Sequence, residues 1–132
     1  GAVFRKCAMT GVSAVGAYMV FSEFAGCSAM NSYFQDVKFS GTFFLKTDFS
    51  GSDFGGADLS VIDYGKEHFM TYGELGVRVD SDKIEVIKKT GVKIDSASFR
   101  GCNFRNVKIN SIQREVLDRE SILNREKIYW VD

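Results

Sequence analysis

The sequence lacks a charge imbalance and a long hydrophobic run, and each absence excludes a class of protein. Its 132 residues carry 17 Lys and Arg against 17 Asp and Glu, so the formal net charge is zero. Nucleic-acid-binding proteins present excess basic charge to the phosphate backbone, and we therefore expect no nucleic-acid partner. No run of about 18 apolar residues occurs, so we also expect no membrane-spanning segment.

The sequence has little of what an active site or a metal site needs. His68 is the only histidine, and neither a Ser or Cys nucleophile nor a cluster of ligands is placed with it. The three cysteines, Cys7, Cys27 and Cys102, lack the spacing of a zinc motif, and an odd number cannot pair completely. We interpret them as buried free thiols, with a disulfide or a metal site as the alternative. The sequence predicts no enzyme, no cofactor and no metal.

The chain begins at Gly1 without an initiator methionine or a signal peptide. We expect either that a targeting segment has been removed or that the chain is an excised piece. The corresponding expectation for location is a soluble protein of the cytoplasm or of an organelle, with a plastid as one option.

Apolar residues recur at every fifth position, and this period dominates the chain. It is uninterrupted at Phe34, Phe39, Phe44, Phe49, Phe54, Leu59 and Tyr64. A helix repeats its apolar face at 3.6 residues and a half-buried strand at 2. A step of five therefore indicates a chain that turns a corner after each unit. Extended both ways, the register covers 22 positions from Phe4 to Ile109, all apolar except Glu74 and Lys89.

Three other positions of the five-residue repeat also show a preferred residue type, and each recurs along the chain as a column. A small or β-branched residue stands two positions before the apolar residue and points inward as well, because side chains alternate along a strand. Glycine often stands two positions after it, where the backbone turns. Asp or Asn often stands just before it, as at Asp48, Asp53, Asp58 and Asp63. We interpret these as corner residues that bond the local backbone rather than as a cation site, because consecutive ones lie on different faces.

Residues 47–51 (TDFSG), 52–56 (SDFGG) and 57–60 (ADLS) resemble the pentapeptide-repeat family. The resemblance is strong for residues 32–64 and 97–111, looser for 2–31, and broken between 65 and 91. It implies an all-β solenoid, a right-handed quadrilateral β-helix with four pentapeptides to each turn. Stacked coils of this kind bury a continuous core that single repeats could not form.

The domain prediction is a β-helix over residues 1–111 and a C-terminal capping helix with a tail over residues 112–132. Asn110 and Gln113 have the spacing of a capping box, so we expect a helix to begin there. We interpret this helix as a seal on the last coil. The alternative is a dimerisation or partner helix, with Tyr129, Trp130 and Val131 as an apolar hook.

Residues 65–91 form an irregular excursion from the pattern. The simplest account is that the wall continues through them with bulges. Coils of twenty residues would then stack Val77 between Ala57 and Ala97. The alternative is a protruding loop that contacts a partner, with His68 and Tyr72 as candidate contact residues.

The first coils carry an unusually apolar surface. Val15, Val20 and Phe21 stand at positions other than the central inward one. Either a hydrophobic cap packs on them, or another protein covers this end. Because Phe4 arrives without a preceding cap, the end of the solenoid is either a docking site or a truncation.

These observations predict a non-enzymatic protein–protein interaction or scaffold module, part of a larger protein or assembly. The partners are one or more proteins of unidentified kind, and a homodimer through one end of the solenoid is an option. One alternative is a processed subunit of a plastid or thylakoid complex. Another, implied by the family, is a Qnr-like or MfpA-like DNA mimic that binds gyrase, against which the zero net charge argues.

Overall fold

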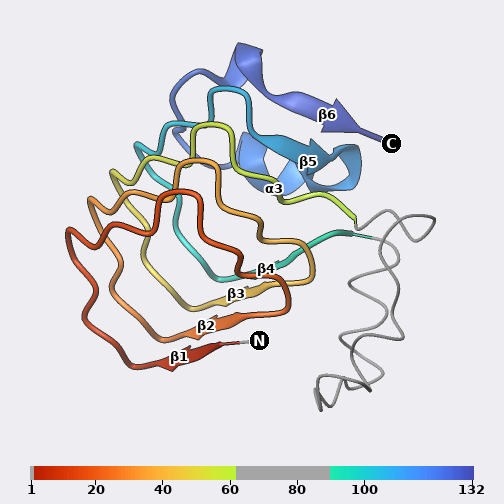
Figure 1. Ribbon diagram of the computed structural model, residues 1–132. Coiled ribbons are helices and arrows are strands. Elements are labelled where there is room, and N and C mark those ends of the chain that lie inside the picture. Colours follow the sequence, from red (N-terminus) through yellow and green to blue (C-terminus); the bar gives the residue numbers. More distant parts are fainter. Residues whose placement is uncertain (1, 62–89) are drawn as a thin grey trace, which may run out of the picture.

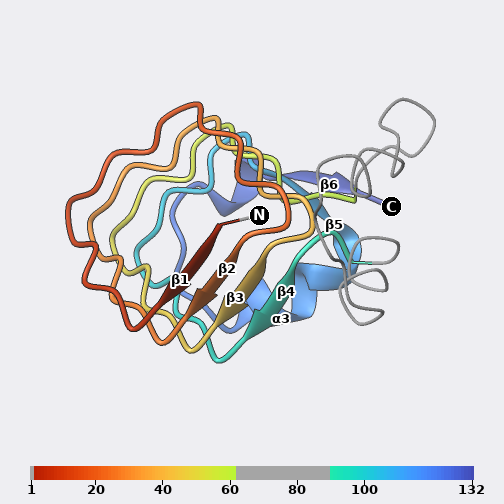
Figure 2. The same ribbon diagram turned by 60° about the horizontal axis from the view of Figure 1, so that its bottom comes forward.

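The computed structural model describes residues 2–61 and 90–132. In these residues the chain winds into a stack of coils, a β-solenoid, with the N-terminus at one end and the C-terminus at the other (Figure 1). One side of the stack is a parallel sheet of four three-residue strands, seen side by side in Figure 2. Its members are β1 (Val3–Arg5), β2 (Glu23–Ala25), β3 (Phe43–Leu45) and β4 (Lys93–Asp95).

Three more sides consist of isolated parallel bridges that lie five residues apart along each coil. Ala8 pairs with Ser28 on the second side, Ser13 with Tyr33 on the third, and Tyr18 with Lys38 on the fourth. The predicted four-sided β-helix is therefore confirmed. Its coils are here called coil 1 (residues 2–21), coil 2 (22–41), coil 3 (42–61), coil 4 (92–111) and coil 5 (112–132).

The corners form as the sequence predicts. Gly11 and Gly51 take φ of 75° and 74°, a region that residues with a Cβ rarely enter. Carboxylates just before the apolar position bond the turning backbone: Asp48 Oδ1 accepts from the Ser50 N–H at 2.9 Å, and Asp53 Oδ1 from the Gly55 N–H at 2.8 Å. The interpretation as corner residues is thus confirmed for Asp48, Asp53 and Asp58, whose Oδ1 accepts from the Ser60 N–H at 3.0 Å. Asp63 lies outside the described residues.

Phenylalanine fills the core in two recurring arrangements. Rings stacked along the axis lie nearly parallel, as in Phe24–Phe44 (5.8 Å between centroids, 17°) and Phe49–Phe99 (5.4 Å, 7°). Rings on adjacent sides of one coil meet edge to face, as in Phe44–Phe49 (5.3 Å, 85°). Both arrangements satisfy the ring quadrupole, so one column of aromatics packs along the axis and around it.

The small inward column carries hydrogen bonds between coils. Ser32 Oγ donates to the Met9 carbonyl at 2.8 Å and accepts from the Val12 N–H at 3.2 Å in the coil before it. Ser52 Oγ repeats both bonds one coil later, to the Ala29 carbonyl and from the Ser32 N–H. The residues of this column are therefore small and also form hydrogen bonds as donors and acceptors. These bonds satisfy backbone groups at the corners that are not paired in the ladder.

Coil 3 stacks directly on coil 4, and this corrects one prediction. β3 pairs with β4 so that Phe44 lies opposite Ile94, an offset of fifty residues rather than twenty. The expected column with Val77 between Ala57 and Ala97 is wrong, because the residue following Ala57, Asp58, bridges to Lys108. A period of five does not reveal how many units separate two stacked coils, so the sequence could not fix this pairing.

The C-terminal residues form a fifth, irregular coil rather than one long helix. Strand β5 (Lys108–Asn110) leads into a 3₁₀ turn η1 (Ser111–Gln113) and the five-residue helix α3 (Arg114–Asp118). A second 3₁₀ turn, η2 (Arg125–Lys127), precedes strand β6 (Tyr129–Val131), which pairs in parallel with β5. The helix is confirmed, but it is short, and the tail adds a rung to the solenoid.

The expected capping box does not form, because both side chains have other partners. Asn110 Oδ1 accepts from the Val61 N–H at 2.7 Å, and Gln113 Nε2 donates to the Val92 carbonyl at 2.8 Å. A weaker contact of 3.3 Å joins Gln113 Nε2 to the Thr90 carbonyl. The two side chains thus hold the chain on either side of the gap between residues 61 and 90.

Candidate interaction surfaces

The described residues offer no cluster of chemically active groups. Residues 2–61 and 90–132 contain no group of three or more His, Cys, Asp or Glu placed to hold a metal ion. No helix in these ranges has the length and apolar character needed to cross a membrane. The candidate sites are therefore surfaces, and the two ends of the stack differ most.

The inward side chains of coil 1 are only partly covered. Phe24 and Phe44 are fully buried, whereas Phe4, in the same column, is half-buried. Met9, Ala14 and Met19 are likewise only partly buried and pack on the core from one side. The described residues place no coil beneath coil 1, so apolar positions that are fully covered in coils 2 and 3 are only partly covered here.

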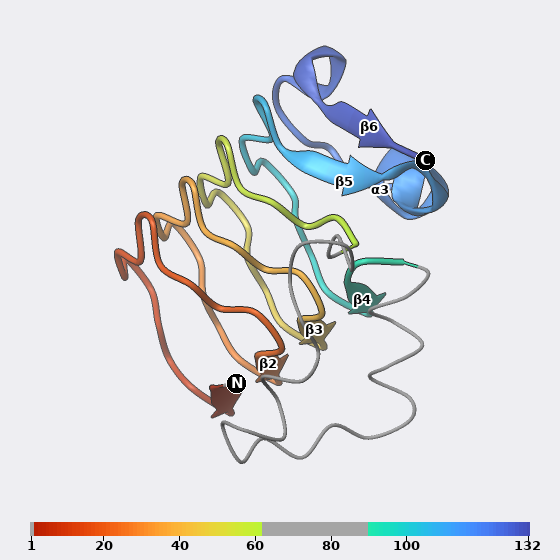
Figure 3. The ribbon, with the colours of Figure 1, turned by 45° about the vertical axis from the view of Figure 1, so that its right-hand side comes forward.

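The backbone edge of coil 1 is open as well. Ala8 and Ser13 bridge to Ser28 and Tyr33 on one side, and within the described residues no strand pairs with their other side. An edge of this kind presents N–H and C=O groups to any strand of suitable length. Coil 1 therefore combines partly exposed apolar side chains with a pairing edge. Figure 3 shows the backbone of this coil at the N-terminal end of the stack.

The predicted contact residues in coil 1 separate into exposed and buried ones. Val15 is 54% exposed, as expected of a surface contact. Val20 and Phe21 are 6% and 7% exposed, so their placement on the surface was wrong. Phe21 has a positive φ of 60° at its corner, which breaks the strand alternation on which the prediction rested. Val20 shares a buried corner column with Ser40 and Ser60.

The other predicted contact residues lie elsewhere. His68 and Tyr72 are outside the described residues. Tyr129 is 66% exposed, whereas Trp130 is partly buried, stacks in register on Ile109, and has the Arg114 guanidinium 4.6 Å above its ring. Trp130 therefore packs as part of the closed end rather than as a projecting hook.

The C-terminal end is closed by apolar side chains of coil 5. Leu117 of helix α3 is fully buried and Ile128 is 8% exposed. Ile122 and Trp130 pack against the same core. Arg125 donates from Nη2 to the Glu120 carbonyl at 2.7 Å and also to the Leu117 carbonyl at the end of α3. Coil 5 thus covers the aromatic column at this end.

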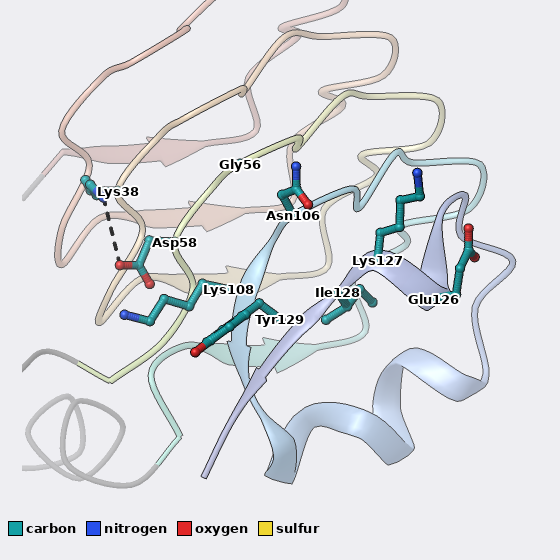
Figure 4. A pocket seen from close by; sticks show the side chains of 9 residues that line it. All are labelled: Lys38, Gly56, Asp58, Asn106, Lys108, Glu126, Lys127, Ile128 and Tyr129. Atoms are coloured by element: carbon teal, nitrogen blue, oxygen red, sulfur yellow. Dashed lines mark ion pairs between the residues drawn. The ribbon is translucent and has the colours of Figure 1, made fainter.

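A groove of about 640 Å³ lies beside the closed end, on the fourth side of the stack (Figure 4). Tyr129 borders it together with a ladder of alternating charge, Lys38, Asp58 and Lys108. Lys38 Nζ lies 4.0 Å from Asp58 Oδ2. Both signs of charge alternate along the groove, so its field favours neither an anion nor a cation.

The cysteines stand in the small inward column, and their surroundings differ. Burial raises the pKa of the Cys102 thiol to about 12, and the thiol donates to the Phe49 carbonyl at 3.0 Å. Cys27 is buried and donates to the Phe4 carbonyl at 3.1 Å. Cys7 is half-buried at the open end, where partial burial and then the adjacent Cys27 thiol raise its pKa. All three are free thiols.

Residues 27–60 match the family model described as pentapeptide repeats (8 copies). The matched stretch spans most of coils 2 and 3, where the aromatic column and the four-sided ladder are most regular. These residues are therefore pentapeptide repeats. No curated protein matches the sequence of the chain.

Two solved structures are similar to the chain. One is a pentapeptide repeat protein from the thylakoid lumen of Arabidopsis thaliana, 17% identical, covering 92% of this chain and 83% of the other, with a TM-score of 0.38. The second is QnrB1, a plasmid-mediated fluoroquinolone resistance protein, 12% identical, with a TM-score of 0.27. That alignment covers 99% of this chain and 52% of QnrB1, so the chain spans about half the length of QnrB1.

Proposed function

We propose that this chain is a non-enzymatic interaction module that docks to protein through coil 1. The observation that carries the proposal is the contrast within one column, in which Phe24 and Phe44 are fully buried and Phe4 is not. Exposed apolar surface next to an unpaired strand edge is the combination that drives strand addition between proteins.

The filled interior of the solenoid also supports an interaction role. The aromatic column fills the axis of the solenoid, with eight phenylalanines fully buried within the described residues, so no substrate cavity lies along it. The DNA-mimic alternative gains no support, because the ladder on the fourth side places Asp58 between Lys38 and Lys108. A mimic of a phosphate backbone would need like charges in that column.

The test is the mass of the chain in solution, measured by light scattering over a concentration range. In the absence of another partner, we expect coil 1 to pair with a second copy, so the mass should rise with concentration. Val15→Lys, at an exposed position in coil 1, should restore the monomer, because a charge there opposes burial.

The matched control is Ile112→Lys in coil 5. Ile112 is 62% exposed, close to the exposure of Val15, but it lies at the closed end, so this variant should associate as the wild type does. A chain that stays monomeric at every concentration, or an equal effect of the two variants, would contradict docking through coil 1.

A further inference from the structure

Cys7 and Cys27 occupy equivalent positions in coils 1 and 2. Phe4 pairs with Phe24 before them and Ala8 with Ser28 after them, so the two cysteines are stacked in register. The Cys7 N–H lies 3.4 Å from Cys27 Sγ. Adjacent strands are spaced about 4.7–4.9 Å apart, and a disulfide needs Cα atoms about 4.4–6.8 Å apart. The pair therefore meets the distance requirement without any change of fold.

We propose that Cys7 and Cys27 form a reversible disulfide that staples coil 1 to coil 2. The structure holds both as thiols, so this is a modification site whose reduced state is the one described. Stacked side chains in a parallel ladder lie farther apart at Cβ than the about 3.8 Å that is usual in a disulfide. The bond therefore forms with some strain, which makes it easier to reduce than a structural disulfide.

Coil 1 is able to accommodate that strain. The described residues place nothing beneath it, and its inward side chains are only partly packed, so a small tilt toward coil 2 meets little resistance. The bond removes three weak S–H contacts. Cys27 Sγ loses those to the Phe4 carbonyl at 3.1 Å and the Ala25 carbonyl at 3.7 Å, and Cys7 Sγ loses the one to the Arg5 carbonyl at 3.4 Å. Cys102 has no such partner, because its column continues through Ser52 and Ser32.

The reaction requires an oxidant, for which a small-molecule disulfide such as oxidised glutathione suffices. Cys7 reacts first because it is half-buried at the open end, whereas Cys27 is 4% exposed. The Cys7 thiolate attacks one sulfur of the reagent and releases the other as a thiolate. The Cys27 thiolate then attacks the sulfur of Cys7 and releases the second thiolate. The cysteine pair loses two protons and two electrons, and the reagent gains both.

The experiment is alkylation mapping of the full chain after equilibration in glutathione buffers of graded ratio. Trypsin cleaves after Lys and Arg, so Cys7 and Cys27 fall together in peptide 7–38 and Cys102 falls alone in peptide 101–105. We expect peptide 7–38 to lose two hydrogen atoms and both alkylation sites together as the buffer becomes oxidising. Peptide 101–105 should keep its free thiol throughout.

Three variants make the result decisive. Cys102→Ser should leave the conversion of peptide 7–38 unchanged, whereas Cys7→Ser and Cys27→Ser should each abolish it. Serine already fills equivalent inward positions at Ser32 and Ser52, so these variants keep the hydrogen bonding of the column. In the wild type, slower hydrogen exchange at the Lys6 and Met9 amides on oxidation would report the staple directly.

Some outcomes would overturn the proposal. Glutathione attached to Cys7 alone, with Cys27 still free, would show that the second step does not occur. A Cys7-linked dimer of two chains would show that the thiol is accessible but not paired within the solenoid. Independent alkylation of the two cysteines at every ratio would have the same meaning.

Discussion

The two ends of the described stack are built from the same repeat, but coil 5 covers the aromatic column at one end and no described coil covers it at the other. At the C-terminal end, Leu117 and Trp130 close the aromatic column, and β6 pairs with the edge that β5 would otherwise expose. At the N-terminal end, Phe4 is half-buried and Ala8 and Ser13 are bridged on one side. The repeat supplies a column and a ladder, and closing them requires residues outside the repeat.

The largest expected contrast is between Phe44→Ala and Phe4→Ala, two truncations in one column. Phe44 is fully buried among four phenylalanine rings, so its loss should lower the free energy of unfolding by about 3–5 kcal/mol. Among the described residues, Phe4 has one stacked neighbour, Phe24, at 4.9 Å, and its loss should cost about 1 kcal/mol. Urea denaturation of both variants measures the difference. Equal losses would mean that coil 1 is as well packed as coil 3.

A second contrast uses two glycines with almost the same backbone conformation. Gly91 has φ of 77° and its added Cβ would lie 2.7 Å from the Ser60 carbonyl carbon. Gly11 has φ of 75° and nothing within 4 Å. Both alanine variants carry the left-handed penalty of about 1–2 kcal/mol, but Gly91→Ala must also displace backbone. We expect thermal unfolding to separate the two, with Gly91→Ala the less stable.

The third prediction concerns the junction between coil 3 and coil 4. Asn110→Ala removes the acceptor of the partly buried Val61 N–H, and the loss of such a bond costs about 1 kcal/mol. Hydrogen exchange at the Val61 amide should accelerate while the Phe49 amide stays protected. Ser111→Ala is the control, because in the described residues the Ser111 side chain bonds to the exposed Asp132 side chain, at 3.1 Å. Unchanged exchange at Val61 would show that Asn110 does not hold the junction.

The smallest effect is a pH dependence from Cys102. Its thiol ionises at about pH 9 when unfolded and at about 12 when folded. Below pH 9 both states keep the proton. Above it, only the folded state does, so the free energy of unfolding should fall by about 1.4 kcal/mol per pH unit. Cys102→Ser should flatten this decline between pH 9 and pH 10 in urea titrations. A decline of the same slope in the variant would assign it to other groups.

The regular part of the fold could be predicted because the residue type at each position of the pentapeptide indicates its structural role. The five-residue register of Phe24, Phe34 and Phe44 required a corner after each unit, and the aspartates before it required a local bond. The small column contains the hydroxyl residues Ser32, Thr42 and Ser52, so its hydrogen bonds between coils could also be predicted from the sequence. We base the prediction only on the small size of these residues.

The wrong predictions concern contacts between coils, which a five-residue period does not specify. The stacking of Phe44 on Ile94 follows from which coils meet, and a five-residue repeat allows every multiple of five. Asn110 and Gln113 have the spacing of a helix cap, but both side chains instead form hydrogen bonds with backbone groups, of Val61 and Val92 respectively. Burial of Val20 likewise depends on its corner column rather than on its place in the pentapeptide.

The bonds made by Asn110 and Gln113 hold the end of coil 3 and the start of coil 4 at fixed positions, whatever the length of the chain that connects them. Asn110 holds Val61 and Gln113 holds Thr90, and β3 pairs directly with β4. Closing a longer connection costs only about 0.6 kcal/mol for each doubling of its length. A change in the length of the connection is therefore expected to alter the free energy of unfolding less than loss of the Asn110 bond does.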